Sequence, residues 1–122
     1  MSDAPGIMLP PLLSARQITK DYFDGTRVLR VLDCADLDIM PGEALSIVGA
    51  SGAGKSTLLH LLGALDRPTS GSIKLNEQEL SQLDSRQLAA VRNRSVGFIF
   101  QFHHLLGGFT ALENVMMPGL IL

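Results

Sequence analysis

The chain is poor in cysteine and tyrosine and contains no tryptophan. A single cysteine among 122 residues, Cys34, excludes an internal disulfide framework and fits a reducing compartment. We expect Cys34 to be a small buried apolar residue. No apolar run approaches the ~18–20 residues needed to cross a bilayer, and the amino end carries Asp3 without the basic segment of a signal peptide. The sequence therefore predicts a soluble protein.

Charge is also scarce. The formal net charge is −2 and 18% of the residues are charged, so no strong field favours nucleic acid or acidic lipid. We expect neither nucleic-acid binding nor direct insertion into lipid. Apolar residues, in contrast, make up 46% of the chain, which is rich for a small monomer. A parallel sheet covered on both faces accounts for part of this excess, and a surface for a partner accounts for the rest.

Residues 49–57 form a complete phosphate-binding loop. They match the pattern G-x-x-x-x-G-K-[ST], with the apolar run 44–48 before them and the leucine-rich, helix-period run 58–62 after them. The motif thus lies between a predicted buried strand and a predicted helix, which is the context that it needs. We predict that this loop holds the phosphates of a nucleotide. The candidate binding residues are Gly49, Ala50, Ser51, Gly52, Ala53, Gly54, Lys55, Ser56 and Thr57.

Each residue type in this loop suits an anion. The glycines allow successive N–H groups to curl around a phosphate, and the helix that begins near Gly54 adds its first amides and its positive dipole end. Lys55 can reach the β- and γ-phosphates as a compact cation, and the Ser56 hydroxyl is a candidate Mg²⁺ ligand. Thr57 offers its amide and hydroxyl to the phosphates, while the small side chains at 51 and 53 let the loop approach its ligand.

The remaining pattern predicts alternating strands and helices. Residues 1–11 are expected to be a flexible leader and residues 12–122 a partial domain. Strands are expected over 12–23, 28–40, 44–48, 72–75 and 95–100, the second being a half-exposed antiparallel strand. Helices are expected from 54 to about 65, from an N-cap at Asp84 to about Arg94, and after a cap at Thr110.

A strand that ends in Gln101 is followed by Phe-His-His-Leu-Leu-Gly-Gly-Phe-Thr-Ala-Leu-Glu-Asn-Val over residues 102–115. With the phosphate loop and the run Leu-Leu-His-Leu-Leu-Gly at 58–63, this segment resembles the nucleotide-binding subunits of ABC transporters. The resemblance is strongest to the ATP-binding subunits of lipoprotein-releasing systems and their relatives among macrolide exporters, and it spans about residues 12–118. It implies an α/β fold: the P-loop NTPase core of an ABC nucleotide-binding domain with an amino-terminal antiparallel β subdomain, truncated.

The resemblance assigns roles to matching positions. It implies ATP and Mg²⁺ as cofactors, with Tyr22 stacking on adenine and with Ser56 and Gln101 as metal ligands, Gln101 also meeting the attacking water. Residues 102–109 would contact integral membrane subunits, and the intact protein would be a homodimer at the cytoplasmic face of a bacterial inner membrane. Gly107 and Gly108 depart from the stiffer, proline-containing pair of relatives and raise backbone freedom there.

The three histidines are not expected to bind metal. His103 and His104 are adjacent, so their side chains point in different directions, and further ligands are lacking nearby. His60 lies in a leucine-rich helix, where we expect a satisfied packing residue rather than a ligand.

The chain lacks several elements that the resemblance leads one to expect. No Ser-Gly-Gly and no Asp-Glu pair occurs in the 122 residues, so neither a signature motif nor a carboxylate base is assigned. We therefore expect negligible ATP hydrolysis by this polypeptide and a tendency to aggregate. A non-catalytic nucleotide-binding or interaction module from a truncated gene stays open, as does the ATPase of a macrolide or peptide exporter. A GTPase or small-molecule kinase is disfavoured because no Asn-Lys-x-Asp guanine reader is present.

Overall fold

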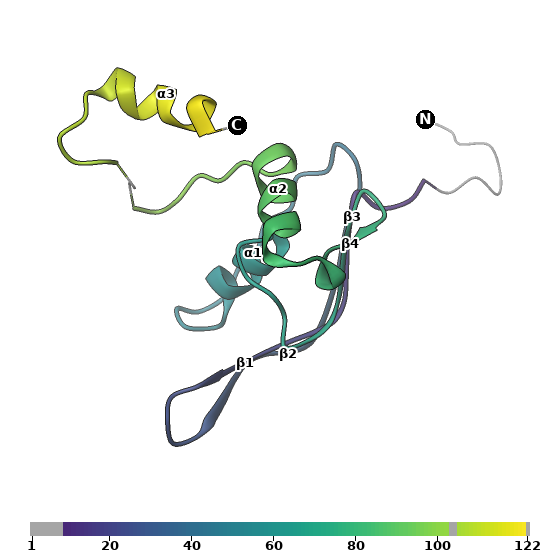
Figure 1. Ribbon diagram of the computed structural model, residues 1–122. Helices are drawn as coiled ribbons and strands as arrows, with labels where there is room; N and C mark the ends of the chain where they lie inside the picture. The colour runs from purple at the N-terminus through teal and green to yellow at the C-terminus, as the bar shows by residue number, and fades with distance from the viewer. Residues whose placement is uncertain (1–8, 103–104, 122) are drawn as a thin grey trace.

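Four strands form one antiparallel sheet in the order β2-β1-β3-β4 (Figure 1). The computed structural model describes residues 9–102 and 105–121. In it β1 spans Leu13–Phe23, β2 Val28–Ile39, β3 Ser70–Leu75 and β4 Gln78–Glu79. The strands predicted over 12–23, 28–40 and 72–75 are confirmed, whereas most of the predicted leader lies outside the described residues.

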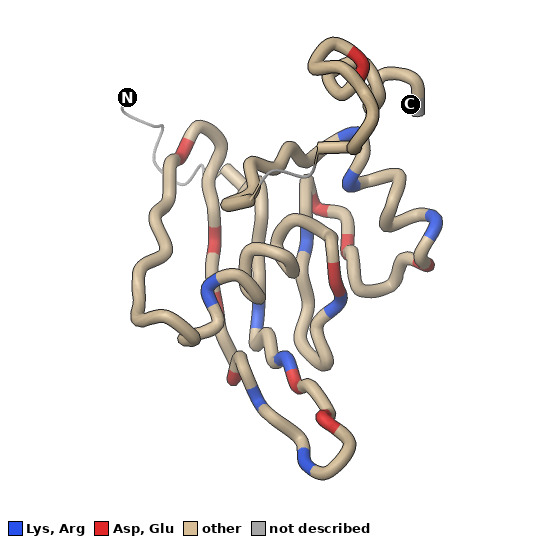
Figure 2. The backbone as a smooth tube through the Cα atoms, turned by 90° about the vertical axis from the view of Figure 1, so that its left-hand side faces the viewer, with Lys and Arg blue, Asp and Glu red and all other residues tan. Residues whose placement is uncertain are grey.

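The β1–β2 hairpin is the longest feature of the sheet and projects beyond it (Figure 1). A tight turn closes it, in which the Asp24 carboxylate accepts hydrogen bonds from the backbone N–H groups of Thr26 and Arg27, each at 2.9 Å. Acidic and basic residues are interspersed along this hairpin (Figure 2). One such pair joins Arg30 to Asp21 at 2.8 Å across the two strands and holds the pKa of Asp21 below its ordinary value.

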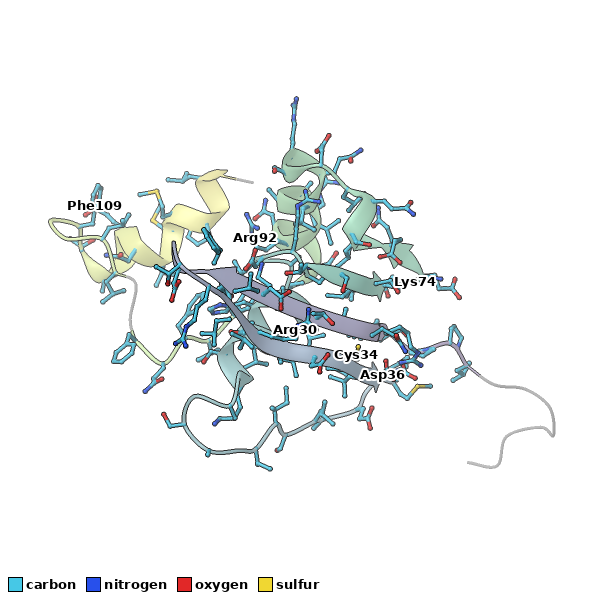
Figure 3. The ribbon with its side chains drawn as sticks, turned by 90° about the horizontal axis from the view of Figure 1, so that it is seen from below. Arg30, Cys34, Asp36, Lys74, Arg92 and Phe109 are labelled. Atoms are coloured by element: carbon cyan, nitrogen blue, oxygen red, sulfur yellow. The ribbon has the colours of Figure 1, made fainter. Side chains whose placement is uncertain are left out.

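An irregularity in this hairpin overturns the prediction that Cys34 is buried. Cys34 is exposed, and it has a positive φ of 50° at a place where the β1–β2 register shifts. Its N–H donates to the buried Thr19 hydroxyl at 3.2 Å, so the threonine takes the inward position. The prediction depended on the general tendency of cysteine to be buried, and the register shift places this cysteine outward instead. Figure 3 shows Cys34 beside Asp36 on the hairpin.

Two helices lie on one side of the sheet and form the core with it (Figure 1). These are α1 at Lys55–Leu62 and α2 at Ser85–Ser95, with a short 3₁₀ turn, η1, at Leu80–Gln82 before α2. The most deeply buried large side chains are Ile18 from β1, Leu61 from α1 and Ile73 from β3. The full core comprises Leu13, Ala15, Ile18, Leu61, Leu62, Ala64, Ile73, Leu75, Leu80 and Leu88.

The amino end of α2 confirms the predicted cap at Asp84. Asp84 accepts a hydrogen bond from the Gln87 N–H at 2.8 Å, and the Gln87 side chain accepts one from the Asp84 N–H at 3.0 Å. This reciprocal capping box satisfies two amides that a helix end otherwise leaves unpaired. Near the other end, the Arg92 guanidinium donates to the Ala64 carbonyl at 3.0 Å and ties α2 to the residues that follow α1.

Two predicted strands are absent. Within the residues that the structure describes, neither 44–48 nor 96–100 belongs to a sheet, and Ser95 is instead the last residue of α2. Both segments are largely exposed: 87% of Val48 and all of Ile99 are accessible. An extended segment becomes a strand only when it forms a regular ladder of hydrogen bonds with a neighbouring strand, and in the described residues neither segment is part of such a ladder.

The last helix, α3 at Ala111–Ile121, lies apart from the sheet at the end of a long extended connection (Figure 1). Its predicted cap is present: Thr110 Oγ1 accepts from the Glu113 N–H at 3.1 Å, and the Glu113 carboxylate accepts from the Thr110 N–H at 2.8 Å. Large apolar side chains on α3 are exposed, including Leu112, Val115 and Leu120. In the described ranges, no helix has the length and apolar character to span a membrane.

Candidate functional site

The loop over residues 49–54 folds into a tight, glycine-dependent turn before α1. Gly52 and Gly54 have φ values of 82° and 94°, which side chains other than glycine adopt at a cost. The Ala53 N–H donates to the Ala50 carbonyl at 3.1 Å and closes the turn. Gly54 is the N-cap of α1 and has no side chain to bind the first amides of the helix, so these amides are left for a ligand.

Gly54 also packs directly against β2. A Cβ atom at this position would lie 3.1 Å from both the carbonyl oxygen and Cγ1 of Val31 and 3.2 Å from Cδ2 of Leu32. These separations are closer than side chains ordinarily allow. The third glycine of the motif is thus favoured both by its φ value and by its close contact with β2, which packs against the loop at this point.

The Lys55 side chain turns back over the loop that precedes α1. Its Nζ donates to the carbonyl oxygens of Gly49 and Ala50 at 2.6 and 2.7 Å. These two bonds hold the cation inside the curve of the loop rather than in open solvent. Gly49 and Ala50 thus present the carbonyls that orient the Lys55 ammonium in this structure.

A cleft of about 500 Å³ opens beside this loop. In this cleft the predicted residue Gln101, which is distant in sequence, lies on the same lining as the hydroxyl groups of Ser56 and Thr57. The lining residues are Val31, Ser51, Gly52, Gly54, Lys55, Ser56, Thr57 and Gln101. The structure thus gathers most of the predicted binding residues in one place, while Gly49, Ala50 and Ala53 form the back of the loop. Their roles in binding remain predictions.

The chemistry of this cleft fits a nucleotide triphosphate with its metal. Its size is within the ~300–1,000 Å³ of small-molecule sites. The free amides at the start of α1 and the Lys55 ammonium suit phosphate oxygens. The hydroxyl groups of Ser51, Ser56 and Thr57 and the Gln101 carboxamide are neutral oxygen donors, the kind of ligand that Mg²⁺ accepts together with phosphate oxygens and water.

Tyr22 does not line the cleft. It lies near the turn end of β1, opposite Leu29 of β2, with 43% of its surface accessible. The Lys20 ammonium lies 5.2 Å from the centroid of its ring. The structure therefore places Tyr22 outside the group formed by the phosphate loop and Gln101, and its stacking on adenine stays a prediction.

The expectation that His60 is a packing residue of its helix is wrong. His60 is exposed on α1, whose buried residues are Leu61 and Leu62. Because successive helical residues are about 100° apart, a core face centred on these two leucines turns His60 toward solvent. His103 and His104 lie outside the described residues.

Sequence reasoning missed the contribution of β2. Val31 lines the cleft and, with Leu32, contacts the position where Gly54 would carry a Cβ. The available signal was the glycine itself, because a glycine at a helix start often marks a close approach of two backbones. The sequence does not show which strand makes that approach, since the contact joins residues more than twenty positions apart.

The family described as ABC transporter matches residues 32–119. The chain is 53% identical over 110 residues to the lipoprotein-releasing system ATP-binding protein LolD of Shewanella frigidimarina, covering 90% of the chain and 46% of the relative. It is 51% identical over 117 residues to LolD of Xylella fastidiosa, covering 96% of the chain and 49% of the relative. The chain thus spans about half the length of these curated relatives.

Solved structures show the same likeness in three dimensions. The dimeric bacterial ABC transporter cassette MJ0796 superposes with a TM-score of 0.85 at 38% identity, over 89% of this chain and 47% of that one. A post-hydrolysis state of MJ0796 bound to ADP and Pi matches equally well. The predicted fold class, a truncated cassette with an antiparallel β subdomain, is confirmed by these neighbours and by the antiparallel sheet.

Proposed function

The chain belongs to the ABC transporter family, and on that premise we propose that it binds Mg-ATP as the ATP-binding portion of a lipoprotein-releasing subunit. The observation that carries this proposal is the cleft that joins Lys55, Ser56 and Thr57 to Gln101. The likeness to LolD over nearly the whole chain supports lipoprotein release as the process that ATP binding serves.

Different residues of the cleft bind different parts of the nucleotide. The backbone amides at the start of α1 bind the β-phosphate region, and Lys55 pairs with the β- and γ-phosphate oxygens. Ser56 and Gln101 supply the protein oxygens for Mg²⁺, which when bound neutralises charge on the phosphates. Tyr22 provides an aromatic face for adenine. Val31 closes the cleft on the side of β2.

The polypeptide itself is proposed to bind ATP without hydrolysing it. Its 122 residues contain neither an Asp-Glu pair nor a Ser-Gly-Gly sequence, so no carboxylate base and no signature motif are available to the bound nucleotide. Hydrolysis, dimerisation and coupling to transport are proposed for the longer protein to which such a portion corresponds. That protein would work at the cytoplasmic face of the inner membrane.

Residues 102–109 are the proposed contact with integral membrane subunits. Phe102 is 73% accessible, Leu105 65% and Phe109 48%, so three large apolar side chains are available to a partner. Phe109 lies far from the sheet, at the tip of the segment before α3 (Figure 3). A membrane subunit that inserts an apolar helix here would cover surface that is costly to expose.

Asn114 holds this segment in shape despite its two glycines. Its Oδ1 accepts the Leu106 N–H at 2.8 Å, and its Nδ2 donates to the carbonyls of Thr110 and Phe109 at 2.9 and 3.4 Å. Asn114 thus bridges the turn that contains Gly107 and Gly108. Its hydrogen bonds, made from α3, offset the loss of stiffness that we expect from the two glycines.

Replacing Asn114 with alanine is expected to free the turn. The Leu106 amide loses its acceptor, so its hydrogen exchange should accelerate about fivefold to tenfold, the factor that corresponds to a bond worth ~1 kcal/mol. Site-resolved exchange in the N114A chain measures this, with N114D as control, because aspartate keeps the acceptor. Equal exchange at Leu106 in all three proteins would contradict the role given to Asn114.

Competition between nucleotides tests the proposed function. A fluorescent ATP analogue is bound to the chain with Mg²⁺ and then displaced by ATP, GTP or AMP. ATP should compete most strongly and AMP about 100-fold more weakly, because AMP cannot reach Lys55 with β- and γ-phosphates. GTP should fall between them, since the chain contains no guanine-reading motif. Absence of binding, or AMP competing as well as ATP, would contradict the proposal.

A further inference from the structure

Lys20 connects the predicted adenine-stacking residue to the segment that follows the phosphate-loop helix. Its side chain, on β1, is only 13% accessible. The ammonium lies 3.1 Å from Asp66 Oδ2, donates to the Arg67 carbonyl at 2.8 Å and sits 5.2 Å from the centroid of the Tyr22 ring. Two oxygens and one aromatic face thus contact this partly buried cation.

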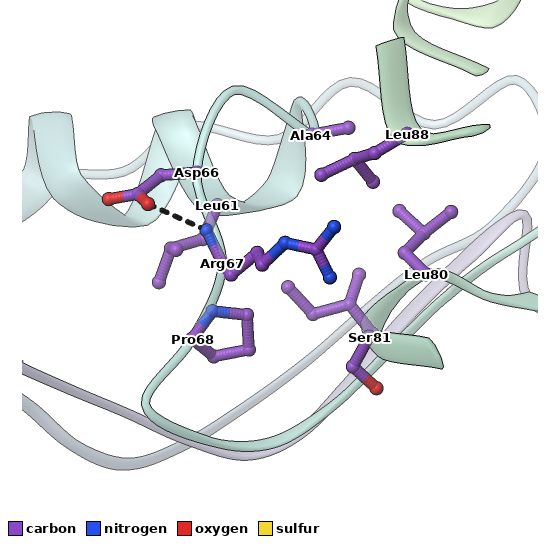
Figure 4. A pocket seen from close by; sticks show the side chains of 9 residues that line it. Leu61, Ala64, Asp66, Arg67, Pro68, Leu80, Ser81 and Leu88 are labelled. Atoms are coloured by element: carbon purple, nitrogen blue, oxygen red, sulfur yellow. Dashed lines mark hydrogen bonds between the residues drawn. The ribbon is translucent and has the colours of Figure 1, made fainter. Parts of the chain in front are cut away.

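The anchor of this cation is itself well held. The Arg67 N–H donates to Asp66 Oδ1 at 2.8 Å, and the Arg67 side chain extends over a small pocket between Leu61, Leu80 and Leu88 (Figure 4). Partial burial raises the pKa of Asp66, but the Arg67 amide and the Lys20 ammonium outweigh it, so the pKa stays below its ordinary value and the carboxylate is charged at neutral pH.

Further hydrogen bonds tie the same connection to β1 on both sides of Lys20. The Thr69 N–H donates to the Thr19 carbonyl at 2.8 Å, and Thr69 Oγ1 accepts the Asp21 N–H at 2.9 Å. The position of the ammonium relative to α1 is therefore fixed by the backbone as well as by the ion pair.

The ring of Tyr22 is less firmly held than the Lys20 ammonium. It lies near the projecting end of the hairpin and is 43% accessible. A cation within about 6 Å of an aromatic centroid is attracted by the negative face of the ring. The Lys20 ammonium therefore lies over one face of the Tyr22 ring, and the accessible part of the ring is left for a second planar group to stack on.

We propose that Lys20 is a positioning residue for the base of the nucleotide: it fixes the Tyr22 ring against the connection after α1, so that the ring stacks on adenine while the phosphates occupy the loop at the start of α1. This inference rests on the proposed function. Lys20 lies against the Tyr22 ring and does not line the cleft beside the phosphate loop, so we expect its effect to be on recognition of the base alone.

The chain offers a direct optical test, since Tyr22 is its only tyrosine and it has no tryptophan. Tyrosine emission therefore reports on Tyr22 alone. ATP and inorganic tripolyphosphate, each with Mg²⁺, are titrated into the unaltered chain and into K20M, K20R and K74M. Lys74 is an exposed lysine of β3 (Figure 3), so K74M removes the same charge elsewhere.

In the unaltered chain ATP should change the Tyr22 emission and tripolyphosphate should not. By isothermal calorimetry, which also detects the optically silent tripolyphosphate, K20M should weaken ATP binding about fivefold and leave tripolyphosphate binding within about twofold. K20R, which keeps a cation, and K74M should bind ATP normally. A merely structural lysine would weaken both ligands together, and that result would overturn the inference, as would an unchanged ATP affinity in K20M.

Two further outcomes separate this inference from the proposed function. If the unaltered chain binds ATP and K55A does not, but K20M binds as the unaltered chain does, only the role of Lys20 is overturned. If the unaltered chain binds neither ligand, the proposed function fails and the inference falls with it. Should K20M not fold, D66N replaces it. The substitution is at a half-exposed position, the ammonium loses its ion pair and keeps only the Arg67 carbonyl, and an ATP-selective weakening in the same direction is expected.

Discussion

Replacing Lys55 with alanine should reduce the affinity for Mg-ATP about 100-fold, because charge-assisted hydrogen bonds to phosphate are worth roughly 3 kcal/mol together. The ammonium is already held inside the loop by the carbonyls of Gly49 and Ala50, so little has to be ordered when the phosphates arrive. Titration of the chain and of K55A with Mg-ATP by isothermal calorimetry measures the difference.

The control for this change is K74A, which removes one positive charge from the surface of β3. It should bind Mg-ATP as the unaltered chain does, because an exposed charge is screened by solvent and salt. If K55A kept its ATP affinity within threefold, the cleft beside the phosphate loop would not be the nucleotide site.

The second large effect concerns folding. Gly71, in β3, has a φ of 94°, and a Cβ there would lie 2.3 Å from the Gln17 carbonyl oxygen and 2.7 Å from that of Arg16. Both contacts are with backbone atoms of β1, which no change of side-chain rotamer relieves. Replacement by alanine should therefore destabilise the chain by about 3 kcal/mol or more and lower the melting temperature by about 15 °C.

Thermal unfolding followed by circular dichroism compares G71A with G97A. Gly97 is a suitable partner because it is exposed and a Cβ at this position meets nothing within 4 Å. G97A should melt close to the unaltered chain. A melting temperature of G71A within about 3 °C of that value would show that the β1–β3 pairing near Gln17 can open without loss of the sheet.

Features that depend on neighbouring residues were predictable from the sequence. The caps at Asp84 and Thr110 each join residues three positions apart, and the phosphate loop is a continuous stretch whose glycines dictate its turn. The two long strands of the hairpin are separated by only four residues, so their antiparallel pairing also follows from local order.

Features that depend on distant partners were not. The segments 44–48 and 96–100 have the composition of buried strands, but a strand also needs neighbouring strands to pair with. The composition of a segment does not show whether such neighbours are present. The exposure of Cys34 results from a register shift that involves β1 as much as β2. Likewise, nothing near Lys20 in the sequence indicates that its ammonium meets Asp66 and Arg67.

The contact between Gly54 and β2 sets an order of events during folding. The β1–β2 hairpin closes over a four-residue turn that the Asp24 carboxylate stabilises by hydrogen bonds. Such local pairings form within microseconds, long before contacts between distant segments. Val31 and Leu32, which contact Gly54 in the folded chain, are thus expected to be in position before residue 54 arrives. We therefore expect the loop to take up its anion-binding curve only on a hairpin that has already formed, so that a mutation slowing hairpin closure also delays the acquisition of nucleotide affinity during refolding.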